Sequence, residues 1–128
     1  MKTTTTLLSG VTVTAAAQYA AGAASVDCNA LSVNDIVIEA TATNGSVGAG
    51  NGKYIDIFWA WASTSISSSI PATLGPAAQS MRILLAPEAS GVRVALSPVV
   101  TMKGRYAYIW YSHEALNDTV TLTVKVVS

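Results

Sequence analysis

Charged side chains are scarce in this 128-residue chain. They make up 11% of it, against about 25% in an average soluble domain, and seven Lys and Arg residues balance seven Asp and Glu residues. Without net positive charge the chain lacks the usual electrostatic means of holding nucleic acid or anionic membranes. A neutral, charge-poor surface tends to associate with other molecules. We therefore expect an associating protein, with no nucleic acid and no membrane among its partners. The alternative is a Thr- and Ser-rich surface that is polar enough without charge.

Cysteine and histidine each occur once, as Cys28 and His113. One cysteine cannot form an internal disulfide, and one Cys with one His cannot build a zinc site. We expect Cys28 to be a small, partly buried apolar residue. The pairs Asn34-Asp35 and Asn117-Asp118 lie in turn-like positions, where such side chains commonly bond the backbone. Calcium binding is the alternative there, but we predict no metal and no cofactor.

Long apolar runs are also lacking, so no segment approaches the length of a membrane span. Residues 1–25 carry Lys2 and the small-residue stretch Ala21–Ala24, as a weak secretory signal would. However, Val11 and Val13 alternate with threonines in place of a solid apolar run. We therefore expect this segment to be part of the folded chain.

Alternation of apolar and polar residues with a period of two is the dominant pattern, and it predicts β-strands. It is clearest in Thr119–Val127, where one face carries valine and leucine and the other threonine and lysine. Further strands are predicted at residues 3–14, 35–43, 54–62, 81–86, 91–97 and 105–111. Residues 87–90 are interpreted as a hairpin connection. Seven short strands predict an all-β, single-domain antiparallel β-sandwich over residues 1–128. A jelly-roll form stays open, as does an N-terminal arm or strand over residues 1–30.

The segments between these strands hold at most one short helix, near residues 15–24. Seven of the ten residues of Ala15–Ala24 are alanine, which favours helix, but ten residues are marginal and a packed loop is the alternative. Asn44–Gly52 holds four of the nine glycines and is expected to be a flexible tip. The segment Ser63–Ser80 has no charge. A loop of that length is expected to bind something or to pack on a neighbour.

Catalytic residues are not grouped in this sequence. His113 lies between Ser112 and Glu114, and adjacent strand residues point to opposite faces. No Gly-x-Ser-x-Gly motif supports a hydrolase. Asp56 lies in an apolar strand and is expected to be the only partly buried carboxylate, in an ordinary ion pair with one of three arginines: Arg82, Arg93 or Arg105. We predict that the protein is not an enzyme; a hydrolase around His113 is the third hypothesis.

Aromatic residues gather on two of the predicted strands. Alternation places Trp59 and Trp61 on one face of one strand, and Tyr106, Tyr108 and Trp110 on one face of the other. An inward face would form core, and an outward face would form a protein contact or a sugar-stacking platform. Together with apolar residues of the uncharged segment, they form the candidate contact surface: Trp59, Trp61, Ile66, Ile70, Leu74, Tyr106, Tyr108 and Trp110.

Three sequence features carry a resemblance to a known class of proteins. They are the Thr-rich start Lys2–Thr6, the strand Ile55–Trp61 followed by a Ser/Thr-rich loop, and the ending Gly104–Tyr111, turn and final strand. With these features the chain resembles small virion proteins of tailed bacteriophages, namely capsid decoration (cement) proteins and head or tail adaptors.

This resemblance implies a non-enzymatic homo-oligomer, a trimer or higher. It would bind a capsid or tail lattice through partners such as a major capsid protein. The implied location is the virion, assembled in the host cytoplasm. The alternative is a carbohydrate-binding module or receptor-binding domain that holds a glycan on a surface aromatic platform.

Overall fold

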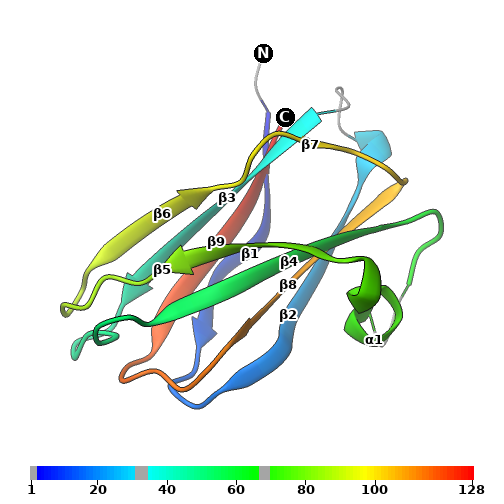
Figure 1. Ribbon diagram of the computed structural model, residues 1–128. Helices are drawn as coiled ribbons and strands as arrows, with labels where there is room; N and C mark the ends of the chain where they lie inside the picture. The colour runs from blue at the N-terminus through cyan, green and yellow to red at the C-terminus, as the bar shows by residue number, and fades with distance from the viewer. Residues whose placement is uncertain (1–2, 31–34, 67–69) are drawn as a thin grey trace.

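Two antiparallel β-sheets packed face to face form the computed structural model, which describes residues 3–30, 35–66 and 70–128 (Figure 1). Sheet A contains, in spatial order, β1 (Thr4–Val13), β9 (Val120–Val127), β3 (Asp35–Asn44) and β6 (Val92–Leu96), with β7 (Val100–Thr101) paired to β3. Sheet B contains β2 (Gln18–Asp27), β8 (Tyr106–His113), β4 (Tyr54–Ala62) and β5 (Gln79–Leu84). Within these described ranges, three short helices connect strands: η1 (Cys28–Ala30), α1 (Ile70–Leu74) and η2 (Gly75–Ala77).

The strands form nested antiparallel pairs, from the two ends of the chain toward its middle. β1 pairs with β9, β2 with β8, β3 with β6 and β4 with β5, so the chain behaves as one long antiparallel ribbon folded over itself. This arrangement is a jelly roll. The prediction of an all-β antiparallel sandwich is confirmed. Residues 4–13 and 18–27 lie in the two sheets, and the assignment of residues 1–128 to a single domain stays a prediction.

The core lies between the sheets and consists of the inward side chains of alternating positions. From β9 these are Val120, Leu122, Val124 and Val126, each at most 1% exposed. Isoleucines of β4, β5 and β8 face them from sheet B. Each fully buried side chain of this kind contributes about 1.5–3 kcal/mol, so the strands with the cleanest alternation are also those that stabilise the fold.

Residues 18–24 of the alanine-rich segment belong to a strand, and the expectation of a helix or packed loop is wrong for them. β2 begins at Gln18 and pairs with β8, with register shifts after Gln18 and after Ala21. Ala20 and Gly22 have φ values of 58° and 65°, which no right-handed helix tolerates. A ten-residue alanine helix is marginal without packing, so pairing with β8 prevails. The single α-helix of the described residues is α1, one turn long.

The connection between β5 and β6 is not a hairpin turn, because the two strands belong to different sheets. After β5 the chain buries Leu85 and Ala86 and crosses from sheet B to sheet A. The side-chain amide nitrogen Nδ2 of Asn44 fixes this crossing by donating to the carbonyl oxygens of Ala86 (2.5 Å) and Glu88 (2.8 Å). The sequence shows two short strands joined by turn residues, and that pattern is the same for a hairpin and for a crossing.

Asp118 holds the glycine-rich loop after β3 in place, contrary to the prediction of a flexible tip. Its carboxylate accepts hydrogen bonds from the backbone N–H groups of Val47 (3.0 Å), Gly48 (2.8 Å) and Thr119 (2.8 Å). These bonds, with that of Gly48 the strongest, lower the pKa of Asp118. Asp118 is only 9% exposed, so the expectation that Asp56 is the only partly buried carboxylate is wrong.

Candidate contact surface

The aromatic residues of β4 and β8 divide between the two faces of sheet B. Trp59 and Trp61 point toward sheet A and join the core. Trp59 is 4% exposed, and its indole N–H donates to Gln79 Oε1 at 2.8 Å. On this face the core interpretation of the aromatic residues holds.

The opposite, outer face of sheet B carries Tyr106, Tyr108 and Trp110, but another segment of the same chain covers it. Residues 63–66 and 70–78, here called the α1 segment, pack on it through Ile66, Ile70 and Leu74. The backbone N–H of Ile66 donates to the Tyr108 hydroxyl at 2.6 Å. The uncharged segment therefore packs on its own sheet (Figure 1).

Burial corrects part of the predicted contact surface. Trp59, Tyr108 and Trp110 are 4%, 1% and 4% exposed, so they do not lie on the surface. The other five predicted residues are half-buried: Trp61, Ile66, Ile70, Leu74 and Tyr106. Alternation identifies which side chains share a face, but it cannot show that a distant segment folds over that face. A partner for the half-buried residues stays a prediction.

A different group of apolar residues is exposed, and the sequence reasoning missed it. Val92, Val94 and Leu96 of β6 are 54%, 59% and 63% exposed, and Leu84 of β5 and the nearby Val99 are 61% and 67% exposed. β5 and β6 are the edge strands of the two sheets and lie on the same side of the sandwich (Figure 1). We call these five residues the β6 side. The signal for it was the alternation of residues 92–96, which looks the same whether the apolar face points inward or outward.

A cavity of about 400 Å³ opens next to the β6 side, between the start of β5 and residues 98–103. Trp59, Gln79, Val99 and Lys103 are among its lining residues. The indole N–H of Trp59 is already bonded to Gln79. Val99 belongs both to the cavity lining and to the β6 side.

The single histidine is a structural group in this fold. His113 is 2% exposed, with Nδ1 at 2.6 Å from the carbonyl oxygen of Glu114 and Nε2 at 3.2 Å from Gln18 Oε1. In the register of β4 and β8, Ser112 lies opposite Asp56 on the outer face of sheet B, whereas the His113 side chain faces inward. This geometry gives His113 no hydrogen bond to the neighbouring hydroxyl that a hydrolase would need to activate.

The predicted ion pair of Asp56 is confirmed, with Arg82 as its partner. Arg82 Nε lies 2.9 Å from Asp56 Oδ1, and the guanidinium group stacks over the Tyr54 ring at 3.7 Å from its centroid. Both side chains lie on the outer face of sheet B and are partly exposed. A pair of this kind orders the surface and contributes little to stability.

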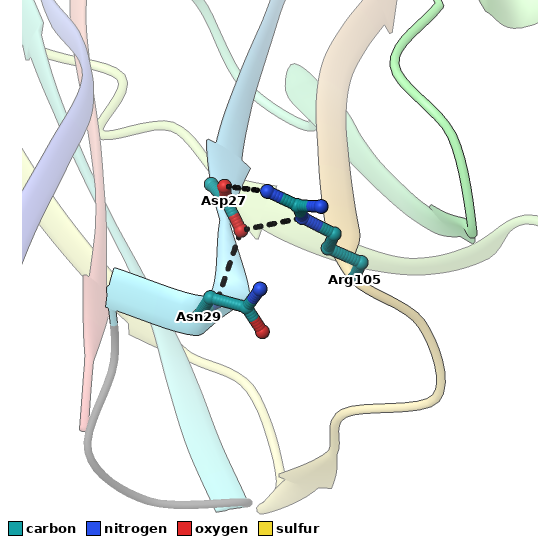
Figure 2. A network of polar contacts seen from close by, with 3 residues as sticks. All are labelled: Asp27, Asn29 and Arg105. Carbon is teal, nitrogen blue, oxygen red and sulfur yellow. Dashed lines mark hydrogen bonds and ion pairs between the residues drawn. The ribbon is translucent and has the colours of Figure 1, made fainter.

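A second polar network joins the end of β2 to the start of β8 (Figure 2). Asp27 accepts from Arg105 Nη2 at 3.2 Å and from the backbone N–H of Asn29 at 3.0 Å, and these two bonds lower the pKa of Asp27. Cys28, between them, is 8% exposed, and burial raises the pKa of its thiol. The prediction of a small apolar role for Cys28 is confirmed.

Residues 3–30, 35–66 and 70–128 contain no group of three or more His, Cys, Asp or Glu side chains placed to hold a metal ion. Within the same ranges, no helix has the length and apolar character needed to cross a membrane.

Neither a family model nor a curated protein sequence matches this chain. The chain is similar to a solved structure of Desmodium yellow mottle tymovirus, with 10% identity and a TM-score of 0.36, over 99% of this chain and 85% of that chain. It is also similar to the crystal structure of the infectious bursal disease virus VP2 subviral particle, with 11% identity and a TM-score of 0.19, over 98% of this chain and 38% of that chain.

Proposed function

We propose that this chain is a non-enzymatic structural protein of a virion, specifically that of a tailed bacteriophage. In this proposal it associates with copies of itself and binds the capsid as a decoration (cement) protein, or binds the tail lattice. The observation that carries the proposal is the β6 side, where five apolar side chains are each more than half exposed. The chain around them has 11% charged residues and no net charge.

Soluble monomers usually protect their edge strands with charges, proline, bulges or a covering segment. β6 has one charged residue, Arg93, no proline, and a regular pairing with β3. Its residues Val92, Val94 and Leu96 form an exposed apolar patch along the outer face of sheet A. Such a patch is typical of a surface that another protein covers. A lattice of repeated subunits supplies such a cover.

The jelly-roll fold is used by viral capsid proteins and by lectins alike, so the fold alone does not decide between them. A sugar-stacking platform needs exposed aromatic rings. Trp59, Tyr108 and Trp110 are buried, and Phe58, which stacks with Trp110 at 5.9 Å between centroids, is half-buried. The burial of these rings favours the structural role over glycan binding.

Quantitative mass spectrometry of purified particles from the source that encodes this chain tests the proposal. We expect the chain in a fixed copy number relative to the most abundant particle protein. Absence from the particles, with the chain present in the surrounding lysate, would refute the virion role. Tryptophan fluorescence titration with a glycan panel tests the alternative, and saturable quenching by one sugar would favour it.

A further inference from the structure

We propose that two copies of this chain join edge to edge through β6, antiparallel about a two-fold axis at Val94, so that sheet A continues across the pair. This inference rests on the self-association proposed above and names its surface, its partner and its register. The partner is a second copy of the chain. A pair is smaller than the trimer or higher oligomer expected from the resemblance, so larger assemblies need a second surface.

The backbone of β6 bonds β3 at every second residue. The N–H of Ser97 donates to the carbonyl oxygen of Ile38, and the N–H of Asn44 donates to the carbonyl oxygen of Gly91, both at 2.9 Å. The register between these two bonds is unbroken. Since hydrogen-bonded positions alternate in an antiparallel ladder, Arg93 and Ala95 also bond β3. The N–H and C=O groups of the other three residues, Val92, Val94 and Leu96, therefore point out of the open edge of sheet A.

These outward N–H and C=O groups can pair with the same groups of β6 in a second copy of the chain. When Val94 faces Val94 of the second copy, Val92 faces Leu96 of that copy and Leu96 faces its Val92. Each facing pair exchanges two hydrogen bonds in such a ladder. Three pairs with two bonds each give six, which uses every outward backbone group of the three residues on both copies.

The side chains of β6 suit the same pairing. Val92, Val94 and Leu96 all lie on the outer face of sheet A and are 54%, 59% and 63% exposed. In the proposed register they meet only one another, as apolar cross-strand pairs. Arg93 faces Ala95 of the second copy. Like charges directly opposite each other would destabilise the pair, and this register contains none.

The other edges of the sandwich are less suited to strand addition. β1 has register shifts between Thr6 and Leu8 and between Leu8 and Val11, and β2 has shifts and two positive φ values. Irregularities of this kind twist an edge away from a partner strand. β5 is regular but carries Arg82, whose guanidinium group pairs with Asp56 on the outer face. β6 alone combines a regular ladder with an apolar outer row.

The size of the contact sets its strength. A stable interface buries roughly 1,200–2,000 Å² in total, and a strand of five residues covers less than that. We therefore expect a weak dimer in dilute solution. Pairing becomes complete where copies are held close together, because a lattice raises their effective concentration.

Sedimentation velocity from micromolar to millimolar protein tests this inference with four proteins: wild type, Val94→Pro, Val94→Lys and the control Tyr19→Lys. Proline removes the outward N–H of Val94 and leaves the bonds between β6 and β3, and an edge strand tolerates this change. Lysine places two like charges at the two-fold axis. Tyr19 is 72% exposed on β2, at the edge of sheet B away from β6 (Figure 1).

We expect the wild type and Tyr19→Lys to form dimers with equal dissociation constants. We expect both Val94 variants to raise the dissociation constant by roughly tenfold or more, with unchanged circular dichroism. If Val94→Pro unfolds, Val94→Lys still decides. A monomeric wild type at every concentration overturns the inference, and so does a trimer without dimer. Association that both Val94 variants leave unchanged overturns the β6 surface but leaves self-association standing. Dimers of a chain that is absent from particles would refute the virion role and leave β6 pairing intact.

Discussion

Tyr108→Phe is the sharpest test of how the α1 segment covers the outer face of sheet B. Tyr108 is 1% exposed, and its hydroxyl accepts the hydrogen bond from the backbone N–H of Ile66 at 2.6 Å. The variant keeps the ring and removes only the acceptor. We expect the α1 segment to loosen while both sheets stay intact.

The expected loss of stability follows from the state of the Ile66 N–H. A fully buried donor left without an acceptor costs about 1–3 kcal/mol. Ile66 is half-buried, so water partly replaces the lost acceptor and we expect the low end, about 1 kcal/mol. In a domain of this size that corresponds to a fall in Tm of about 3–5 °C. With a slope of about 2 kcal/mol per molar urea, the unfolding midpoint falls by about 0.5 M.

Urea unfolding followed by tryptophan fluorescence measures the midpoint, and hydrogen exchange measures protection of the Ile66 amide. The matched control is Tyr106→Phe, which removes a hydroxyl from the same strand and the same face of sheet B. We expect the control to unfold with the wild type and to keep Ile66 protected. Equal midpoints for wild type and Tyr108→Phe, or equal losses in both variants, would refute the reasoning.

Three further predictions concern single residues. Gly22→Ala should cost at least about 1–2 kcal/mol from backbone conformation alone, because Gly22 has a φ of 65° and an added methyl group would meet the Tyr111 ring; an unchanged Tm would contradict this. Asp118→Asn should flatten the acid dependence of stability. The N–H of Gly48 holds the native pKa of Asp118 below the unfolded value, so this stabilisation is full above the unfolded pKa and is lost as the pH falls through the native pKa. Urea midpoints from neutral to acid pH measure it, and parallel curves for wild type and variant would count against it. Cys28 should react with a thiol reagent far more slowly in the native protein than in urea, since burial raises its pKa; equal rates would exclude a buried thiol.

Strands whose side chains alternate cleanly were predictable from the sequence. The predicted strand 54–62 matches β4, and the predicted strand ending at Val127 begins one residue before β9. β2 was missed because alanine and glycine show no apolar alternation, and because its pairing depends on β8, whose paired residues lie 79 to 95 positions away along the chain. An ion pair of Asp56 was predictable, but the choice of Arg82 among three arginines was not, because it depends on the pairing of β4 with β5.

The candidate surface was less predictable, for two physical reasons. The burial of Tyr108 and Trp110 depends on the α1 segment, whose packing is a tertiary contact that no local pattern encodes. The exposure of Val94 depends on β6 being an edge strand, and edge and central strands can share one alternating pattern. Two partners of Asp118, the N–H groups of Val47 and Gly48, lie about 70 residues away from it, whereas turn chemistry alone suggested only bonds to its own neighbours, such as that to Thr119.

The register shifts of β1 limit how far sheet A can grow. β1 and β6 are its two outermost strands, and the displaced register of β1 offers an incoming strand no straight ladder. In the proposed dimer the contact through β6 is reciprocal, so each molecule uses the one regular edge of sheet A, as the described residues form it, in a single event. Such a contact closes at two molecules and cannot propagate into an open filament, as a head-to-tail contact would. A charge-poor protein with exposed apolar strands is thereby kept from polymerising along this sheet.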